Sequence, residues 1–363
     1  MLRPMSSTPR QPLTGPDVWL GADMAHSTRW QRRLPAPVID EIDQALQAAR
    51  RRGMAWSATT AAQFPLPSIG KLVEDVRAEL ETGSGMMKLS GLPVGRYSED
   101  ELRQIYFGLG SHFGKPVFQN RSGELMRAIR DEAAASAGGT DLGKTYGQIE
   151  GQEKDKPFLS SYARTLSNGQ LRFHTDRTDV VALLCVRQAR AGGVSKIAST
   201  AAVHNAILAR RPDLLEVLYQ DFWRSRLGEE SKDAASVYPL PIFGLREGKL
   251  TSHFSLTYIK AAQLVPGVPK LTPLQREAID VLMATMQELC FEMTFAPGDI
   301  QFLNSHVTYH GRTPFQDDAS TGQDRLLLRL WLSMPDNRPL PKGQEVLWGN
   351  IEAGIYRGGI AQV

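Results

Sequence analysis

Apolar residues recur with the spacing of an amphipathic helix in several segments of the chain. The segments with this spacing are 35–53, 69–85, 98–114 and 272–290. Two of them begin with a capping box, Ser98 with Glu101 and Thr272 with Gln275, in which side chains and backbone amides at the helix start satisfy one another. The pattern predicts helices in all four segments, a mostly helical first third of the chain, and a further helical stretch at about 200–224.

From about residue 115 the pattern changes to short apolar runs separated by Gly, Asn and Pro, which is typical of strands. Together with one earlier run, the predicted strands are 86–92, 124–131, 172–189, 195–200, 299–307 and 324–333. Residues 225–262 show no clear periodicity and are predicted to form a loop-rich lid or binding loop. Because the strands do not alternate with helices as in βαβ units, we predict a mainly β fold, an antiparallel double sheet with flanking helices.

No internal boundary stands out, so we predict one domain. Residues 1–16, rich in Pro, Ser and Thr, are expected to form a flexible tail. The single domain would then run over 17–363, with a helical part to about residue 85, a core at about 86–335 and a C-terminal extension at 336–363.

Composition and charge limit the classes of partner. Hydrophobic residues make up 42% and charged residues 22% of the 363 residues, and the formal net charge is +3, as in ordinary globular proteins. The chain has no long Lys/Arg block, which argues against nucleic acid and anionic membranes, and no apolar run of membrane-spanning length. The N-terminus lacks the apolar stretch of a secretory signal, and Cys185 and Cys290 lie in apolar runs. We therefore expect buried thiols and a cytoplasmic location, with the oligomeric state open.

The apolar run at 171–186 begins with two residues that do not suit a buried strand, His174 and Asp176. In a strand, side chains two positions apart point to the same face, so this imidazole and carboxylate would lie side by side. A buried charge is costly unless it is paired or coordinates a metal. The pair therefore suggests a metal site, although a hydrogen-bonded pair at the surface is the simpler alternative.

A second candidate ligand, His310, follows the predicted strand at 299–307. Two imidazoles and one carboxylate can occupy one face of an octahedral Fe(II) and leave positions open for substrates and O₂. His306, four residues earlier, is a rival ligand, and His310 could equally lie at a strand end with no metal.

The strand predicted at 324–333 carries Arg325, Leu327 and Arg329 on one face. Two arginines pointing the same way from an apolar strand need anions to face, and a guanidinium suits bidentate recognition of a carboxylate. This pattern indicates a pocket for a metal-chelating dicarboxylate. A structural pair of Arg325 with Asp176 or Glu292 is the alternative.

These stretches, "FHTD", "GGVSKIAST", "PGDIQFLNSHVTYHGRTPF" and "RLLLRLWLS", resemble in order and style the taurine dioxygenase and clavaminate synthase-like group of Fe(II)/2-oxoglutarate-dependent oxygenases. The resemblance covers about 85–335 and implies a double-stranded β-helix, or jelly roll, core. It also implies Fe(II) as cofactor and 2-oxoglutarate and O₂ as co-substrates.

Position by position, the resemblance makes His174, Asp176 and His310 the iron ligands. Arg325 and the hydroxyl of Ser195 would hold the distal carboxylate of 2-oxoglutarate. In some relatives the arginine at the position of Arg329 meets an anionic group of the primary substrate. Halogenating relatives replace the ligand carboxylate with a small residue, so Asp176 disfavours halogenation.

The expected reaction is hydroxylation of a C–H bond of a small, anionic or amino-acid-like substrate, with release of succinate and CO₂. Desaturation or ring closure in natural-product biosynthesis would need the same ligands. Aromatic residues of the predicted lid and polar residues before the first ligand are the candidates for contacting the substrate. They are Tyr238, Phe243, His253, Phe254, Tyr258, Ser161, Tyr162 and Arg164, with Tyr162 and Phe254 taken forward.

Three other interpretations stay open at this point. A cupin-type hydrolase or isomerase could use another divalent metal at the same triad, but would not need Arg325 and Ser195. A catalytically silent binding or scaffold protein would lack an intact triad. A protein substrate in place of a small molecule is the third.

Overall fold

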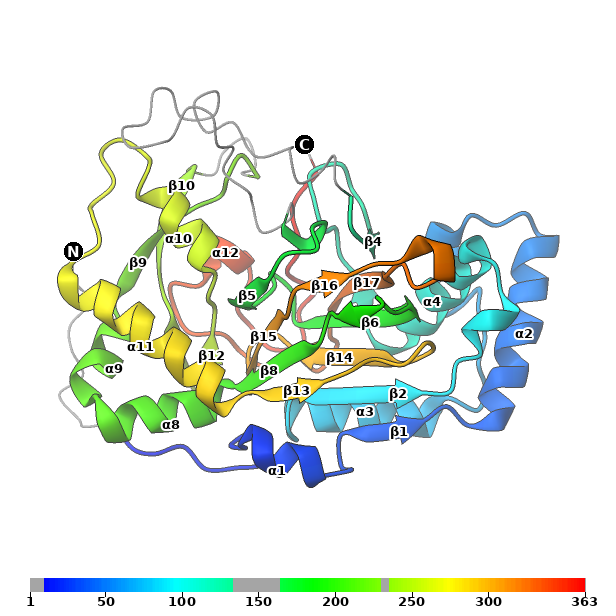
Figure 1. Cartoon of the computed structure of the whole chain (residues 1–363), viewed down its shortest axis with the longest axis horizontal. Helices are drawn as coiled ribbons and strands as arrows, with labels where there is room; N and C mark the ends of the chain where they lie inside the picture. The colour runs from blue at the N-terminus through cyan, green and yellow to red at the C-terminus, as the bar shows by residue number, and fades with distance from the viewer. Residues whose placement is uncertain (1–9, 133–163, 230–234, 363) are drawn as a thin grey trace.

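The computed structural model describes residues 10–132, 164–229 and 235–362, and two facing β-sheets form its centre (Figure 1). The larger sheet has the strand order β1-β2-β14-β6-β17-β3, with β4 also paired to β17. Its strands are β1 (Gln31–Arg33), β2 (Met86–Ser90), β3 (Lys115–Pro116), β4 (Met126–Ile129), β6 (Val180–Arg187), β14 (Ile300–Asn304) and β17 (Leu326–Ser333). The smaller sheet has the order β13-β8-β15-β5 and consists of β5 (Leu171–His174), β8 (Ser195–Ser199), β13 (Phe291–Met293) and β15 (Thr308–Arg312).

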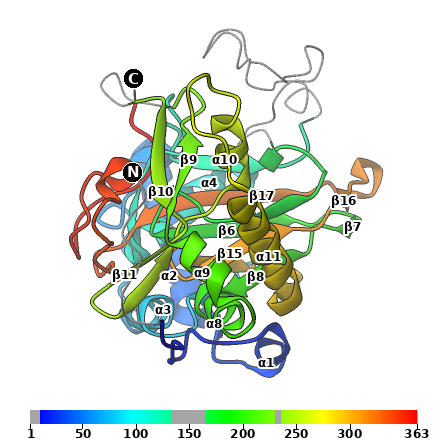
Figure 2. The same cartoon turned by 90° about the vertical axis from the view of Figure 1, so that its left-hand side faces the viewer.

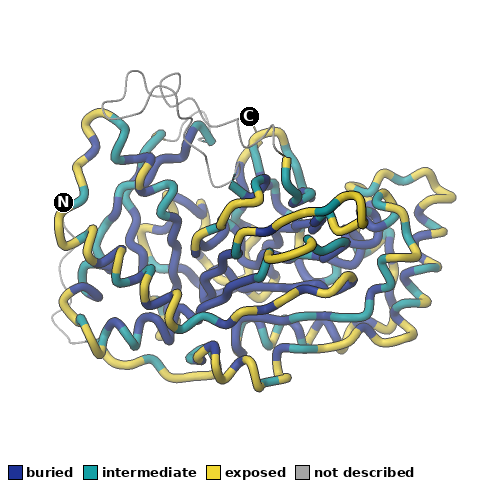
Figure 3. Tube along the Cα trace, viewed as in Figure 1, coloured by how far each residue is buried: buried dark blue, intermediate teal, exposed yellow. Residues whose placement is uncertain are grey.

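Alternating side chains on the strands of the larger sheet separate two cores. On β17, Leu326, Leu328 and Leu330 face a layer of helices, whereas Leu327 and Trp331 face the smaller sheet. The helices of this layer are α2 (Ala36–Arg51), α3 (Gly70–Glu81) and α4 (Glu99–Phe113). The central strands of both sheets are buried, while the outer surfaces of these helices are exposed (Figure 3). The antiparallel double sheet with flanking helices is as predicted, and only the β1–β2 pair is parallel among the described strands.

A second group of helices covers the outer face of the smaller sheet (Figure 2). It consists of α8 (Thr200–Arg210), α9 (Pro212–Leu218), α10 (Leu256–Ala262) and α11 (Pro273–Leu289). Both predicted capping boxes are present, at Ser98 for α4 and at Thr272 for α11. Smaller elements are α1 (Gly21–His26) and the paired strands β7 (Ala191–Gly192) and β16 (Phe315–Gln316).

The described part of the segment 225–262, predicted as loop-rich, is mostly regular structure. β9 (Asp221–Ser225) pairs with β10 (Val237–Pro241), and β11 (Phe243–Arg246) pairs with β12 (Lys249–Ser252) before α10 begins. The sequence hid these strands because prolines and a glycine interrupt them and their apolar residues pack on different clusters. The predicted helical stretch at 200–224 accordingly ends at Leu218.

Residues 10–16, predicted as part of a flexible tail, lie against α8 and α9 instead. The Arg10 guanidinium binds the Glu216 carboxylate, with Nε 2.8 Å from Oε1, and lies 3.4 Å from the ring centre of Tyr219. The Leu13 backbone exchanges hydrogen bonds with the Asn205 side chain. The structure also contains a strand, β1, that precedes the first strand predicted from the sequence.

The prediction of two buried thiols is correct for Cys185, which is buried, but wrong for Cys290, which is partly exposed.

The C-terminal extension, which contains α12 (Glu345–Trp348), is anchored to the core through Asp179. This buried carboxylate accepts hydrogen bonds from Asn337 and Arg357 of the extension and from His306 at the end of the larger sheet. The single-domain interpretation stays a prediction, and within the described residues no helix has the length and apolarity that a membrane crossing requires.

Candidate metal centre and its two cavities

The three predicted metal ligands meet at the edge of the smaller sheet. His174 is the last residue of β5 and pairs in register with His310 of β15. The run predicted as one strand at 172–189 is in fact two, β5 and β6, with a break at 175–179. Asp176 therefore approaches the histidines through this turn and not through strand alternation. The Thr175 amide donates to the Phe254 carbonyl, which fixes the turn.

The ligand atoms of His174, Asp176 and His310 all lie within 4.8 Å of one another. His174 Nε2 is 3.7 Å from Asp176 Oδ1, His310 Nε2 is 3.6 Å from Oδ2, and the two imidazole centres are 4.2 Å apart. All three side chains are buried. The remaining rival, His306, is directed elsewhere, since its Nε2 lies 2.9 Å from Asp179 Oδ1.

The hydrogen bonds and charges around the triad suit a cation. His174 Nδ1 is 2.9 Å from the Arg172 carbonyl, which can only accept, so Nδ1 carries the proton and Nε2 presents its lone pair. Asp176 Oδ2 has no hydrogen-bond partner among the described residues. Burial alone would raise the pKa of Asp176, but Arg329, His310 and His174 hold it below its usual value. Burial and the neighbouring His174 lower the pKa of His310 to about 3.

Asp176 is therefore ionised and His310 neutral at neutral pH, as metal ligands must be. Two imidazole nitrogens and a carboxylate on one side of an open space have the composition of a facial triad for Fe(II). The residues present therefore fit an iron ion.

An inner cavity extends from the triad into the space between the sheets. It is lined by apolar side chains and by Ser195, Arg312 and Arg325. Burial lowers the pKa of Arg325 to about 10, and its Nη1 has no hydrogen-bond partner among the described residues. Ser195 Oγ lies 3.2 Å from the Gln301 amide nitrogen. A buried guanidinium beside a hydroxyl fits the carboxylate of a small dianion.

The structural alternative for Arg325 is wrong. Glu292 lies 3.7 Å from Lys196, and the guanidinium nearest Asp176 belongs to Arg329. No carboxylate oxygen of the described residues lies within 4 Å of the Arg325 guanidinium, so its charge is free to meet a ligand in the cavity.

Sequence reasoning missed Arg312 as a member of this cavity. It lies two residues beyond His310 on β15, so strand alternation places both on one face and could have identified it. Its Nη2 donates to the carbonyls of Ser167 and Gly169, both at 2.6 Å. Burial and the neighbouring Arg325 lower its pKa to about 9.

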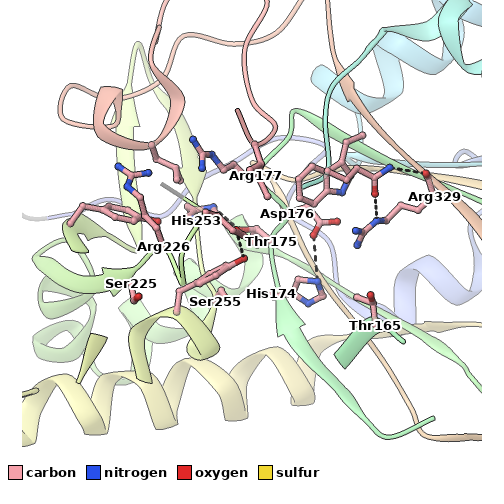
Figure 4. A pocket seen from close by; sticks show the side chains of 17 residues that line it. Thr165, His174, Thr175, Asp176, Arg177, Ser225, Arg226, His253, Ser255 and Arg329 are labelled. Carbon is pink, nitrogen blue, oxygen red and sulfur yellow. Dashed lines mark hydrogen bonds and ion pairs between the residues drawn. The ribbon is translucent and has the colours of Figure 1, made fainter. Parts of the chain in front are cut away.

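An outer cavity opens on the other side of the triad and shares His174, Asp176, Thr165 and Arg329 with the inner one (Figure 4). Arg329 has the predicted orientation, on the same face of β17 as Leu327. Its Nε donates to Gln119 Oε1 at 2.7 Å, and its guanidinium lies 5.0 Å from the ring centre of Trp331. Arg329 is therefore held at the junction of the two cavities.

The predicted substrate residues are divided by the structure. Tyr238, His253 and Tyr258 line the outer cavity. Phe254 does not, because its ring is fully buried in the core behind the smaller sheet, 6.4 Å from the ring of Tyr309, and Phe243 belongs to the same core. Arg164 lines neither cavity. Ser161 and Tyr162 lie outside the described residues.

Several residues of the outer cavity had no signal in the sequence. They come from separate segments, including the C-terminal extension, and are Gln119, Thr165, Arg177, Arg226, Glu229, Leu347 and Ile360. No periodicity connects them, because the fold alone brings these segments together.

Comparisons with known proteins agree with the family resemblance and with the fold described above. Residues 51–331 match the sequence model of the taurine catabolism dioxygenase TauD, TfdA family. The chain is 30% identical to FR-33289 synthase of Streptomyces rubellomurinus, over 92% of this chain and 93% of that protein. It is 27% identical to the taurine hydroxylase-like protein SAT17 of Stachybotrys chartarum, over 86% and 77%.

Among solved structures, asparagine oxygenase AsnO superposes with a TM-score of 0.61 at 15% identity, covering 84% of this chain and 93% of that one. The non-heme iron oxygenase OrfP in complex with Fe and alpha-ketoglutaric acid gives 0.57 at 15% identity, with the same coverage. At this identity the likeness concerns the fold, and it confirms the predicted jelly-roll core.

Proposed function

The chain belongs to the TauD/TfdA family and is therefore an Fe(II)- and 2-oxoglutarate-dependent dioxygenase, and on this premise we propose which residues carry the reaction. His174, Asp176 and His310 hold the iron, and Arg325 and Ser195 hold the distal carboxylate of 2-oxoglutarate. The observation that carries this assignment is the adjacency of the triad, with ligand atoms within 4.8 Å, to a cavity containing a buried guanidinium with an unpartnered nitrogen.

When bound, iron and 2-oxoglutarate supply the activation of O₂, with succinate and CO₂ as products. The residues of the protein exclude water from the site and orient the metal ligands. The apolar side chains of the inner cavity, such as Leu183, Phe295 and Leu327, keep water from the ligand atoms. The His174–Arg172 hydrogen bond fixes the imidazole tautomer that can bind a metal.

The assignment is tested by anaerobic titration. Fe(II) and then 2-oxoglutarate are added to metal-free protein, and the weak visible absorption of the iron-chelated oxoacid is followed. We expect the band in the wild type, its loss in His174→Ala, and a much higher 2-oxoglutarate requirement in Arg325→Ala. A band of unchanged midpoint in Arg325→Ala would refute the role of Arg325.

We propose a small substrate carrying an anionic group, held at the junction of the cavities by Arg329. The position of Arg329 between the triad and the outer cavity supports this. So do the relatives, whose names describe a synthase of FR-33289, a taurine hydroxylase-like protein and an asparagine oxygenase. An unchanged substrate affinity in Arg329→Ala would refute the anion contact.

The reaction that fits is hydroxylation. The retained carboxylate of Asp176 disfavours halogenation, whereas desaturation and ring closure use the same ligand set. Mass spectrometry of the product separates these, because hydroxylation adds an oxygen atom and the other two remove hydrogen. The cytoplasm is the proposed location, supported by the two free thiols Cys185 and Cys290.

A further inference from the structure

The outer cavity contains a second arginine, whose guanidinium makes no hydrogen bond or ion pair within the described part of the chain. Arg177 follows Asp176 in the break between β5 and β6 and lines the cavity together with Asp176 and Arg329. Its Nε is buried and without a hydrogen-bond partner, and no carboxylate oxygen of the described residues lies within 4 Å of its guanidinium. A buried guanidinium nitrogen left unpaired is costly unless a ligand satisfies it.

The backbone around Arg177 is fixed on both sides. The Gly359 amide of the C-terminal extension donates to the Arg177 carbonyl at 2.7 Å. Thr175 is bonded to the 253–254 segment, and Thr178 Oγ1 donates to the Leu332 carbonyl at 2.9 Å. The guanidinium is therefore presented from a rigid turn directly beside the metal ligand, which reduces the entropy lost when it binds a ligand.

Arg177 and Arg329 serve different parts of the cavity. The ionisable groups nearest Arg177 are Arg226, Glu229, Tyr238 and Tyr258, whereas Arg329 is close to Asp176. Figure 4 shows Asp176 between the two arginines. The middle of a molecule that contacts both Arg177 and Arg329 would therefore lie next to the triad.

Among the described residues, the charges of the outer cavity do not balance without a ligand. Three guanidinium groups, of Arg177, Arg226 and Arg329, face two carboxylates, of Asp176 and Glu229. Asp176 lies against His174 and His310, and its charge would be used by the iron. Two positive charges then remain uncompensated.

The three arginines are also not equivalent. The Arg226 guanidinium donates to the carbonyls of Ala235 and Val346 and lies 4.3 Å from the ring centre of Tyr238, so it has a structural role. Arg329 uses its Nε for Gln119. Arg177 makes no such bond within the described part of the chain, which singles it out as the group free to bind a ligand.

We infer that Arg177 is a specificity-determining residue that binds a second anionic group of the primary substrate, so that the substrate is a small molecule with an anionic group toward each end. One group faces Arg329, the other faces Arg177, and the C–H bond between them faces the triad. This inference rests on the proposed function, because it takes the triad and Arg329 as the reaction centre and the first anion contact.

The test compares acids with matched compounds that lack the second charge. The probes are L-aspartate with L-asparagine, L-glutamate with L-glutamine, and O-phospho-L-serine with L-serine. Binding is measured by calorimetry under nitrogen, on protein saturated with Fe(II) and 2-oxoglutarate. The variants are Arg177→Gln, Arg177→Lys and, as a matched control, Arg51→Gln at an exposed position of α2.

We expect wild type to bind at least one acid about tenfold or more tightly than its neutral partner, which corresponds to one charge-assisted hydrogen bond. Arg177→Gln should abolish this preference, Arg177→Lys should restore part of it, and Arg51→Gln should leave it unchanged. Equal binding of acid and neutral partner, binding of none of the acids, or a preference retained in Arg177→Gln would each overturn the inference.

The visible band of iron-bound 2-oxoglutarate, recorded in the same samples, separates the two proposals. If the band is absent in wild type, the assignment of the residues that hold iron and 2-oxoglutarate is refuted. If it is present and the acid preference is absent, the role of Arg177 is refuted while the cofactor assignment stands.

Discussion

Replacing Asp179 with Asn should loosen the C-terminal extension and destabilise the whole protein. The Asp179 carboxylate is buried, with 2% of the residue exposed, and both of its oxygens accept strong hydrogen bonds. Oδ1 accepts from Arg357 Nε and His306 Nε2, each at 2.9 Å. Oδ2 accepts from Asn337 Nδ2 at 2.7 Å and from the Met334 amide at 3.0 Å.

An asparagine has the same shape as the aspartate but cannot accept hydrogen bonds from all the donors around Asp179. Whichever oxygen becomes the amide nitrogen, it would face groups that also donate, and the charge of Arg357 would be left buried and unpaired. Breaking one partner of a buried ion pair costs about 3–5 kcal/mol. Because native proteins are stable by only about 5–15 kcal/mol, this is a large fraction of the total.

The assay is urea unfolding at neutral pH, followed by circular dichroism, with Asp75→Asn as the control. Asp75 forms a surface pair with Lys71 on α3, at 2.8 Å, so its replacement should leave the free energy of unfolding close to that of wild type. Leu347 and Ile360 of the extension line the outer cavity, so substrate affinity should also fall in Asp179→Asn. A free energy of unfolding within about 1 kcal/mol of wild type would refute the reasoning.

Three further predictions address the cofactors and the pH dependence. Ser195→Ala should raise the half-saturating 2-oxoglutarate concentration about fivefold and Ser195→Thr should not, since one hydrogen bond is worth about 1 kcal/mol; equal effects in succinate release would contradict this. Fe(II) added under nitrogen should raise the melting temperature of wild type and a chelator should reverse it, because a ligand of the native state stabilises it; the same rise in His310→Ala would exclude His310 as a ligand. Burial lowers the pKa of His204 to about 4, below its unfolded value, so the stability it contributes is present above about pH 6.5 and lost as the pH falls. From pH 7.5 to 5 this histidine alone should cost about 2 kcal/mol in urea unfolding, and a His204→Asn variant with the same pH dependence would contradict it.

The elements with strong local signals were predictable from the sequence. α4 and α11 carry capping boxes. Side chains two positions apart on a strand share a face, so the orientation of Arg329 with Leu327 on β17 followed from the pattern. The order of the motifs "FHTD", "GGVS" and "HGRTPF" likewise predicted the family. These signals are local, because a helix start or a strand face is determined by residues within a few positions of one another.

The predictions that failed concern contacts between distant segments. Phe254 was assigned to the substrate on its residue type, but the packing of α10 and β15 places its ring in the core. Residues 10–16 look like a tail until α8 and α9 provide a surface for them. The hairpins between 221 and 252 are held by the partners on which their apolar residues pack, which no period in the sequence reveals.

The sequence by itself determined the ligand types, their order along the chain and the faces of the strands that carry them, because these depend on residue identity and on the geometry of single elements. The tertiary structure decided which distant groups share a cavity. It brought Asp176 to the two histidines through a turn, placed Arg312 beside Arg325, and set Arg177 and the C-terminal extension around the outer cavity. Such neighbours depend on how the sheets, helices and extension pack together, and that packing is a property of the whole chain.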